Sequence, residues 1–193
     1  MTLAPLADLA LLERDVRGRV SWLLVALHAV GIPLEQYETA RPPARQGELY
    51  AIGREPRNGE LGHTRTDSLP WHSAHQWGLA VDLVFRVNGR WTWVEPEDGM
   101  WDHMHELARK ADLRGLRNRK GQLIEMPHVQ PANLWPADIA QLPRGPNDTE
   151  GWLAWLRGAG GLVPDARVGA DDVDDLRLGP LRPPLHRHHQ REP

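Results

Sequence analysis

Apolar residues near the amino terminus recur at the spacing of one helical face. Across residues 9–30 they stand three or four positions apart, a period that predicts an amphipathic helix. Gly31 and Pro33 follow directly and are expected to end this helix. The next changes of pattern predict a short extended segment at 34–39, a second helix at 44–52 and a long polar loop at 54–70.

Residues 79–94 change to an alternation of period two, which is typical of strands. Two such runs flank Asn88 and Gly89, a pair that accommodates the positive φ angles of a type I′ turn. A β-hairpin is therefore predicted. Its turn sets two cross-strand pairs, Val87 with Arg90 and Phe85 with Thr92. The same alternation turns Asp82 away from the apolar face of the hairpin.

Further elements are predicted beyond the hairpin. They are a helix at 99–111, a basic turn at 114–120, a strand at 123–130 and a short helix through Trp152, Trp155 and Leu156. Asn147 and Glu150 have the spacing of a capping box for that last helix. From residue 164 onward Asp, Arg, Pro and His dominate, so residues 164–193 are expected to form a disordered tail behind a single domain at 1–163.

The composition is that of an ordinary globular protein. The chain has 193 residues, of which 40% are hydrophobic and 25% charged, and its formal net charge is -3. A domain of this length buries roughly 70% of the surface of its unfolded chain, so no second subunit is required and a monomer is expected. The nearly balanced charge disfavours nucleic acid and anionic membranes as partners.

The chain contains no cysteine, which excludes a Cys nucleophile, a thiolate metal site and a disulfide framework. A metal would therefore have to be bound by His and carboxylate side chains. The longest apolar run, residues 20–32, is shorter than the roughly 20 residues that cross a bilayer. Residues 1–12 lack the basic start of a secretory signal, so cytoplasmic synthesis without a signal peptide is expected.

Two histidines and one aspartate are candidates for a metal site. His75 precedes the hairpin, Asp82 lies in its first strand, and His128 lies in the later strand after Pro127. Two imidazoles and a carboxylate suit Zn²⁺ and leave a fourth position open for water, which is the arrangement of a catalytic site. Because the chain has ten histidines, this spacing alone leaves a surface or core role as the alternative for each.

The segments around these residues are more specific. Residues 73–82 read Ser-Ala-His-Gln-Trp-Gly-Leu-Ala-Val-Asp, and residues 125–130 read Glu-Met-Pro-His-Val-Gln. The first segment resembles the S-x-H-x-x-G-x-A-x-D signature of the zinc D-Ala-D-Ala carboxypeptidase and L-Ala-D-Glu endopeptidase family. The second resembles the acidic-residue-x-x-His motif of that family. Arg41 and residues 46–54 are similar to its upstream block, in which an arginine precedes a helix. The resemblance covers residues 34–130.

This resemblance implies a fold and a site. The implied fold is α+β, with helices packed on a small central antiparallel sheet. These peptidases share this fold with the hedgehog signalling domain. The zinc ligands would be His75, Asp82 and His128. Glu125 would act as the general base and acid, and Arg41 would contact the substrate or the oxyanion. Zinc would acidify its bound water and polarise the scissile carbonyl, and a carboxylate beside that water can carry its proton.

Residues 125–128 bear on both geometry and specificity. Glu125 and His128 are three positions apart and would face opposite ways in a regular strand, so a bend at Pro127 is expected. Endopeptidases of the family typically have Asp before x-P-H, whereas carboxypeptidases and dipeptidases more often have Glu before x-W-H. The chain combines Glu125 with Pro127, so the cleaved bond stays open.

The sequence therefore predicts a zinc peptidase domain at 1–163 that cleaves the peptide stem of bacterial peptidoglycan. An L-Ala-D-Glu endopeptidase of the endolysin type is the favoured hypothesis. A D,D-carboxypeptidase or dipeptidase is one alternative, and a non-catalytic, zinc-containing peptide-binding relative is another. A phage lysin of this kind would reach the wall after release from the cell.

Other polar clusters are interpreted as surface features. His72 is expected to be a polar loop residue. His103 and His105 are expected to be exposed, since they lie on different faces of the predicted helix. The basic residues at 114–120 are expected to form a solvated turn, with an anionic polymer as the alternative partner. The acidic stretch at 171–175 lacks the glycine and the final Glu of a calcium loop.

Overall fold

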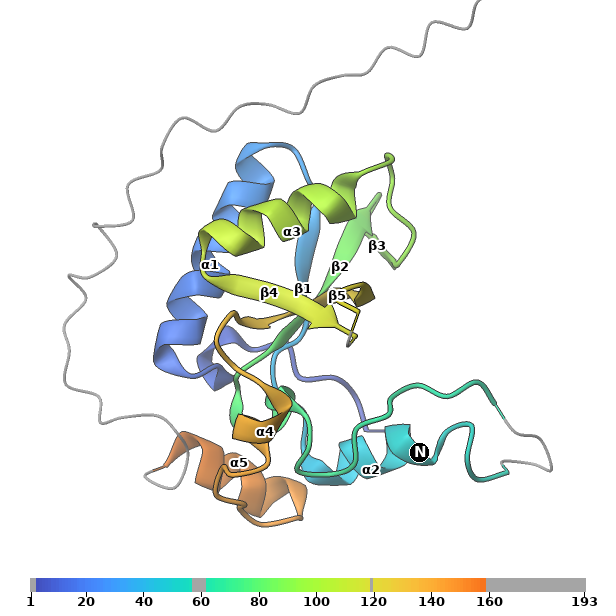
Figure 1. Ribbon diagram of the computed structural model, residues 1–193, viewed down its shortest axis with the longest axis vertical. Helices are drawn as coiled ribbons and strands as arrows, with labels where there is room; N and C mark the ends of the chain where they lie inside the picture. The colour runs from blue at the N-terminus through green and yellow to red at the C-terminus, as the bar shows by residue number, and fades with distance from the viewer. Residues whose placement is uncertain (1–2, 57–61, 119, 159–193) are drawn as a thin grey trace, which may run out of the picture.

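The computed structural model describes residues 3–56, 62–118 and 120–158, and Figure 1 shows its elements. In chain order they are the 3₁₀ helix η1 (Leu9–Leu11), α1 (Arg14–Ala29), β1 (Leu34–Glu38), α2 (Pro43–Ala51), the 3₁₀ helix η2 (Ala74–Trp77), β2 (Val81–Val87), β3 (Arg90–Thr92), α3 (Met100–Lys110), β4 (Leu113–Arg117), β5 (Leu123–Pro131), α4 (Pro136–Ile139) and α5 (Thr149–Arg157). The tail predicted at 164–193 and the domain end predicted at 163 lie outside the described residues.

The strands form one antiparallel sheet in the order β1-β2-β5-β4, with β3 also paired to β2. The hairpin of β2 and β3 has the predicted register, Val87 opposite Arg90 and Phe85 opposite Thr92. Asn88 and Gly89 have φ angles of 48° and 75°, as the predicted turn requires. The predicted class, α+β with helices packed on a small antiparallel sheet, is confirmed.

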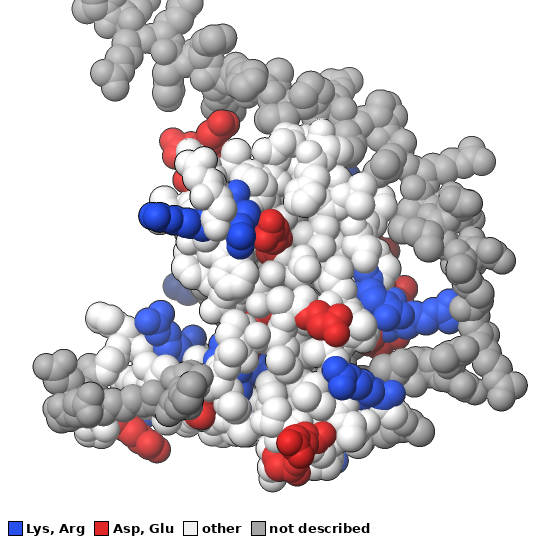
Figure 2. All heavy atoms as spheres, turned by 180° about the vertical axis from the view of Figure 1, so that it is seen from behind, with Lys and Arg blue, Asp and Glu red and all other residues white. Residues whose placement is uncertain are grey.

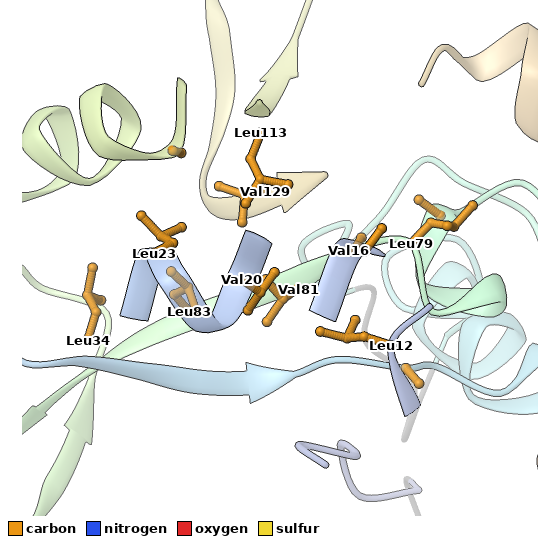
Figure 3. Close-up of a cluster of buried hydrophobic side chains, with 14 of the residues drawn as sticks. Leu12, Val16, Val20, Leu23, Leu34, Leu79, Val81, Leu83, Leu113 and Val129 are labelled. Carbon is orange, nitrogen blue, oxygen red and sulfur yellow. The ribbon is translucent and has the colours of Figure 1, made fainter. Parts of the chain in front are cut away.

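The core lies between the sheet and the helices α1 and α3, while α2 and α5 lie at the opposite end of the molecule (Figure 1). Figure 3 shows side chains of α1 meeting those of four strands: Val16, Val20 and Leu23 of α1, Leu34 of β1, Val81 and Leu83 of β2, Leu113 of β4 and Val129 of β5. Burying one such side chain contributes roughly 1.5–3 kcal/mol. This contact therefore holds β2 and β5, which carry Asp82 and His128, firmly against each other.

The helix predicted at 9–30 is two elements, η1 and α1. They are separated at Glu13, whose backbone N–H donates to the Gly78 carbonyl at 2.9 Å. The Glu13 carboxylate then caps α1 by accepting from the backbone N–H groups of Asp15 and Val16 at 2.9 and 3.1 Å. The apolar periodicity continues across the break because both elements turn their apolar residues toward the same core.

The basic turn predicted at 114–120 is wrong in its first half, because β4 occupies Leu113–Arg117. The strand is held by pairing with β5, including Leu113 with Pro131 and Leu116 with Glu125. Arg114 in this strand lies over the Trp135 ring, 3.9 Å from its centroid. The pairing with β5 and the contact with Trp135 both come from residues distant in the sequence. The local charge pattern contains neither of them, and it therefore indicated a loop.

The cap predicted for the last helix is also corrected. Asp148, and not Asn147, caps α5, with its carboxylate accepting from the Gly151 N–H at 2.7 Å. The Asn147 side chain instead accepts from Trp71 Nε1 at 2.7 Å. A short helix, α4, precedes this region and was not predicted. Its first turn is capped by the Asp138 carboxylate, which accepts from the Trp135 N–H at 2.8 Å.

Charged side chains on the surface are mixed in sign. Figure 2 shows acidic and basic residues scattered in small groups over one face, among uncharged ones. This distribution agrees with the nearly balanced composition. In the described part of the chain, no helix is long and apolar enough to cross a membrane.

Candidate metal centre

Three side chains from separate elements meet beside the sheet. His75 lies in η2, while Asp82 of β2 and His128 of β5 are directly paired across the two strands. The atoms His75 Nε2, His128 Nδ1 and Asp82 Oδ1 form a triangle with edges of 3.1, 3.2 and 3.3 Å. Within residues 3–56, 62–118 and 120–158, no other group of three His, Asp or Glu side chains comes together in this way.

The triangle has the size of one face of a tetrahedral zinc site. Zinc binds imidazole nitrogen and carboxylate oxygen at about 2.0–2.1 Å, which places ligand atoms about 3.3 Å apart. The three side chains are also buried, with exposed fractions of 1% for His75, 8% for Asp82 and 3% for His128. Two imidazoles and one carboxylate leave the fourth position free for water or substrate. The residues present therefore fit a zinc ion.

A glycine in the sequence motif positions the turn that carries His75. Gly78 ends η2 with a φ of 66°, in the left-handed region that favours glycine. A Cβ at this position would lie 2.2 Å from the Leu11 carbonyl oxygen, so a side chain would push the turn away from the N-terminal segment. The close approach allows the Glu13 N–H to reach the Gly78 carbonyl at 2.9 Å.

Buried tryptophans support η2 from the other side. Trp152 of α5 is completely buried, and its Nε1 donates to the Gln76 carbonyl at 3.0 Å. Trp77 Nε1 donates to the Pro143 carbonyl at 2.9 Å. The Trp71 ring packs edge-on against Trp77, with ring centroids 5.4 Å apart. Helix α5 therefore helps to hold η2, in which His75 lies.

Asp82 is shared between the histidines and Arg41. Asp82 Oδ1 faces the two imidazoles, and Asp82 Oδ2 accepts from Arg41 Nη2 at 3.0 Å. Arg41 is 9% exposed and also donates to Glu38 Oε2 at 2.7 Å and to Gln46 Oε1 at 3.1 Å. Arg45 Nε donates to the second oxygen of Glu38 at 2.6 Å. Each charge in this buried row thus has an opposite charge beside it.

These contacts set the protonation of the centre. Burial acts to raise the pKa of Asp82, but the two histidines outweigh it and hold the pKa well below its usual value. Burial lowers the pKa of His75. Burial acts in the same direction on His128, but the hydrogen bond and charge of Asp82 outweigh it and raise the pKa of His128. Burial likewise opposes the charge of Arg41, yet Glu38 and Asp82 raise its pKa.

Gln130 orients His128 and was not singled out from the sequence. His128 Nε2 donates to Gln130 Oε1 at 3.0 Å, and Gln130 Nε2 donates to the Leu134 carbonyl at 3.0 Å. Because a carbonyl can only accept, Leu134 fixes which end of the amide faces the imidazole. Nδ1 is then the nitrogen of His128 turned toward Asp82. The sequence feature that could have identified Gln130 is its position two residues after His128, on the same face of the strand.

Glu38 and Gln46 also belong to the centre and were not assigned roles from the sequence. Gln46 opens the block that follows Arg41, and its Nε2 donates to the Ser68 carbonyl at 2.6 Å, which attaches the loop before η2. Glu38 carried no sequence signal, since a polar residue at the end of a short strand is usually solvated. It is 1% exposed here because it lies between two arginines.

Strand β5 is irregular between Glu125 and His128. The pairs on either side are Leu116 with Glu125 and Arg114 with Gln130, so two steps along β4 (114 to 116) face five steps along β5 (125 to 130). The extra residues form a β-bulge that includes Pro127. The departure from a regular strand expected at Pro127 is therefore confirmed.

Glu125 lies at the solvent edge of the centre. Its side chain is exposed, in contrast to the three buried ligand candidates. Its negative charge acts on both Arg41 and His128 and raises the pKa of each, which places it within electrostatic reach of the centre. Glu125 is therefore an exposed carboxylate whose charge acts on the buried centre.

The remaining histidines divide between surface and interior. His72 is exposed, as predicted. The prediction for His105 is wrong, because it is 6% exposed and its Nε2 donates to the Met126 carbonyl at 2.9 Å. His103 is half-buried. Helix α3 packs on β4 and β5, and this long-range contact covers a histidine whose position on the helix alone indicated exposure.

Three solved structures resemble the chain. The LdcB LD-carboxypeptidase is 19% identical, with a TM-score of 0.47 over 62% of this chain and 58% of that one. The L-Ala D-Glu endopeptidase ChiX of Serratia marcescens is 22% identical, with a TM-score of 0.46 over 67% and 87%. The L,D-carboxypeptidase DacB from Streptococcus pneumonia is 19% identical, with a TM-score of 0.47 over 67% and 71%. The chain thus spans less than two thirds of the first of these proteins.

A comparison with protein families matches residues 10–117 to VanY, D-alanyl-D-alanine carboxypeptidase. The match includes Arg41, His75 and Asp82 and ends before Glu125 and His128. No curated protein sequence matches the chain. Since the match spans more than half of the 193 residues, the chain belongs to the D-alanyl-D-alanine carboxypeptidase family, VanY.

Proposed function

We propose that this protein is a zinc peptidase that hydrolyses the peptide stem of bacterial peptidoglycan. The carrying observation is the buried triangle of His75 Nε2, His128 Nδ1 and Asp82 Oδ1, with edges of 3.1–3.3 Å, in a chain of this family. The exposed carboxylate of Glu125 beside it supplies the acid and base that peptide hydrolysis needs.

The three triangle atoms would hold the zinc ion. When bound there, zinc supplies Lewis acidity, which lowers the pKa of water and polarises the scissile carbonyl. Gln130 keeps the proton of His128 on Nε2, so that Nδ1 can act as a ligand. Arg41 binds the outer oxygen of Asp82, so that Oδ1 stays turned toward the metal position.

Glu125 is assigned the proton transfer. One of its carboxylate oxygens accepts a proton from the attacking water, while the water oxygen forms a bond to the carbonyl carbon. The same carboxyl then gives the proton to the amide nitrogen as the C–N bond breaks. Its exposed position allows it to reach the leaving nitrogen, which none of the buried side chains of the triangle can do.

Arg41 is assigned a role in addition to the one implied by the resemblance. Its guanidinium donates to Glu38, Gln46 and Asp82 and is almost buried, so its first role is to position Asp82. A contact with the substrate or the oxyanion would have to use the Nη hydrogens that these three bonds leave over. We keep that contact as a second role for Arg41.

For the cleaved bond, the L-Ala-D-Glu linkage is our first candidate, since Pro127 before His128 follows the endopeptidase pattern. The second candidate is D,D-carboxypeptidase activity, favoured by the family description and by Glu125 in place of Asp. Removal of the terminal D-Ala and cleavage after L-Ala leave different products, so the two can be separated directly.

The test is mass spectrometry of products from purified peptidoglycan incubated with the zinc-loaded protein. An endopeptidase yields peptides that begin with D-Glu and leaves L-Ala on the glycan, whereas a carboxypeptidase yields free D-Ala. Glu125→Gln, loaded with zinc in the same way, controls for contaminating peptidases. Absence of any product specific to the parent protein would reject hydrolysis, and wall binding without products would favour the non-catalytic relative.

A further inference from the structure

A histidine outside the centre is bonded to the bulge that carries two of its residues. His105 projects from α3, and its Nε2 donates to the carbonyl oxygen of Met126 at 2.9 Å. Met126 lies directly after Glu125 and two residues before His128. His105 is 6% exposed, although it has a polar ring and lies on a helix with exposed neighbours at Asp102 and Glu106.

The bulge explains why the Met126 carbonyl needs a partner from elsewhere. Between the pairs Leu116 with Glu125 and Arg114 with Gln130, β5 has more residues than β4 can pair. Pro127 also has no N–H to contribute to the ladder. The hydrogen bond is partly buried, and a carbonyl there that lacks a partner destabilises the fold. The imidazole N–H supplies the bond that a regular strand would have supplied.

Space for His105 comes from a glycine in β4. A Cβ at Gly115 would lie 2.6 Å from His105 Cε1 and 3.0 Å from His105 Nδ1, and 2.5 Å from Leu123 Cδ1. Cβ contacts this short do not occur without a shift of the neighbour. The absence of a side chain at Gly115 is therefore what lets the imidazole cross β4 and reach the bulge of β5.

The polarity of the bond is fixed by chemistry. A carbonyl only accepts, so Nε2 of His105 carries the proton. Burial lowers the pKa of His105, which favours the neutral ring with a single N–H. The ring is thus held in one tautomer, with its one donor aimed at Met126.

We propose that His105 is a positioning residue that, through the space left by Gly115, fixes the backbone of the β5 bulge so that Glu125 and His128 both serve the metal centre. This inference rests on the proposed function only for the role of Glu125. Its effect on His128 concerns metal binding and is measurable without any substrate.

The experiment compares three variants of the full chain. His105→Gln keeps an N–H donor at nearly the position of Nε2, whereas His105→Met keeps the length and removes the donor. Leu107→Val, at another buried position of α3, reproduces a general loss of packing. Each is measured for zinc affinity, for the visible spectrum of its Co²⁺ form, and for kcat and KM.

We expect His105→Met to lower zinc affinity and kcat by about tenfold or more, to alter the Co²⁺ spectrum and to leave KM within about threefold. His105→Gln should restore most of each value, and Leu107→Val should lower only the melting temperature. Parent-like zinc affinity and Co²⁺ spectrum in His105→Met would overturn the proposal. If the proposed function is wrong, the parent protein shows no turnover, but zinc affinity and the Co²⁺ spectrum still differ between the variants.

Two further measurements do not depend on the folding of His105→Met. Gly115→Ala should displace the His105 imidazole and lower zinc affinity as His105→Met does. A parent-like zinc affinity in Gly115→Ala would count against the role of Gly115. Nitrogen NMR of the histidines in the parent protein should show His105 protonated on Nε2. Protonation on Nδ1 would remove the donor and with it the proposal.

Discussion

The carboxylate of Asp82 is divided between two tasks by Arg41. Arg41 Nη2 donates to Asp82 Oδ2 at 3.0 Å, while Asp82 Oδ1 lies 3.2 Å from His75 Nε2 and 3.1 Å from His128 Nδ1. One oxygen is therefore held by a cation, and the other is left for a metal. The carboxylate of Asp82 is thus already ordered and offers a single ligand atom. Metal binding then costs no further conformational entropy of this side chain.

This relationship predicts different results for two neighbouring arginines. Arg41 and Arg45 both bind Glu38, but Arg41 alone of the two binds Asp82. Arg41→Gln and Arg45→Gln should each lower the free energy of unfolding by roughly 3–5 kcal/mol, because each breaks a buried ion pair. We expect only Arg41→Gln to weaken zinc binding as well, by about 10–100-fold. Urea unfolding and competition with a chelator measure the two effects. Equal zinc affinities in the two variants would contradict the division of Asp82.

Glu125→Gln should abolish turnover while the zinc and the fold stay in place. Glutamine keeps the size of Glu125 but cannot accept a proton at neutral pH, and a general base contributes about 10²- to 10⁴-fold in rate. Asp82→Asn should instead lose metal affinity first, because the carboxylate charge helps to hold zinc. Zinc content and the rate of peptide cleavage are measured on both under saturating metal. A rate for Glu125→Gln above about one tenth of the parent value would assign the proton transfer to another group.

The C-terminal segment should divide into a dispensable and a required part. Residues 164–193 contain few apolar residues, so their removal should leave the hydrolysis of a soluble peptide unchanged. Removal of everything after residue 147 also deletes α5 and the bond from Trp152 Nε1 to the Gln76 carbonyl, which supports the loop of His75. That longer deletion should lose zinc affinity and stability. Loss of soluble-peptide cleavage on the shorter deletion would place part of the tail in the site.

The motif residues of the centre could be predicted because their signals are local. The S-x-H-x-x-G-x-A-x-D segment contains a ligand candidate, the turn glycine and a second ligand candidate within ten residues, and Asn88-Gly89 sets the register of β2 by itself. The alternation along β2 then placed Asp82 on the correct face. Each of these signals operates within one element or one turn.

The residues that support the centre depend on contacts between distant elements and could not be predicted. Strand β4 exists because β5 pairs with it, and His105 is buried because Gly115 of β4 leaves room for its ring. Glu38 is buried because it lies between Arg41, which precedes α2, and Arg45, which lies in α2. A pattern based on the polarity of single residues treats all three as surface, since it does not contain their partners.

Gly78 provides a test of how η2 is positioned. Gly78→Ala places a side chain at a φ of 66° and a Cβ 2.2 Å from the Leu11 carbonyl oxygen, so we expect a loss of more than about 2 kcal/mol in unfolding free energy and weaker zinc binding. Gly18→Ala is the matched control. A Cβ at Gly18 in α1 has no neighbour within 4 Å, so alanine should stabilise the helix by about 0.5–1 kcal/mol. Denaturant unfolding of both variants decides, and equal effects would show that the approach of η2 to η1 is not tightly constrained.

Zinc binding should release a proton from His128 near neutral pH. In the metal-free protein, the charge of Asp82 raises the pKa of His128 above its ordinary value of 6.5, while burial lowers the pKa of His75 below it. Above pH 6.5, His75 is therefore already neutral, and zinc has to displace only the proton on His128 Nδ1. The apparent affinity should therefore rise with pH above 6.5 as His128 loses this proton. Calorimetry in buffers of different ionisation enthalpy should find protons released on zinc binding just above pH 6.5, and Asp82→Asn, which lacks the charge that raises the pKa of His128, should release fewer in that window. If no proton is released in that window, Nδ1 of His128 is not the atom that zinc occupies.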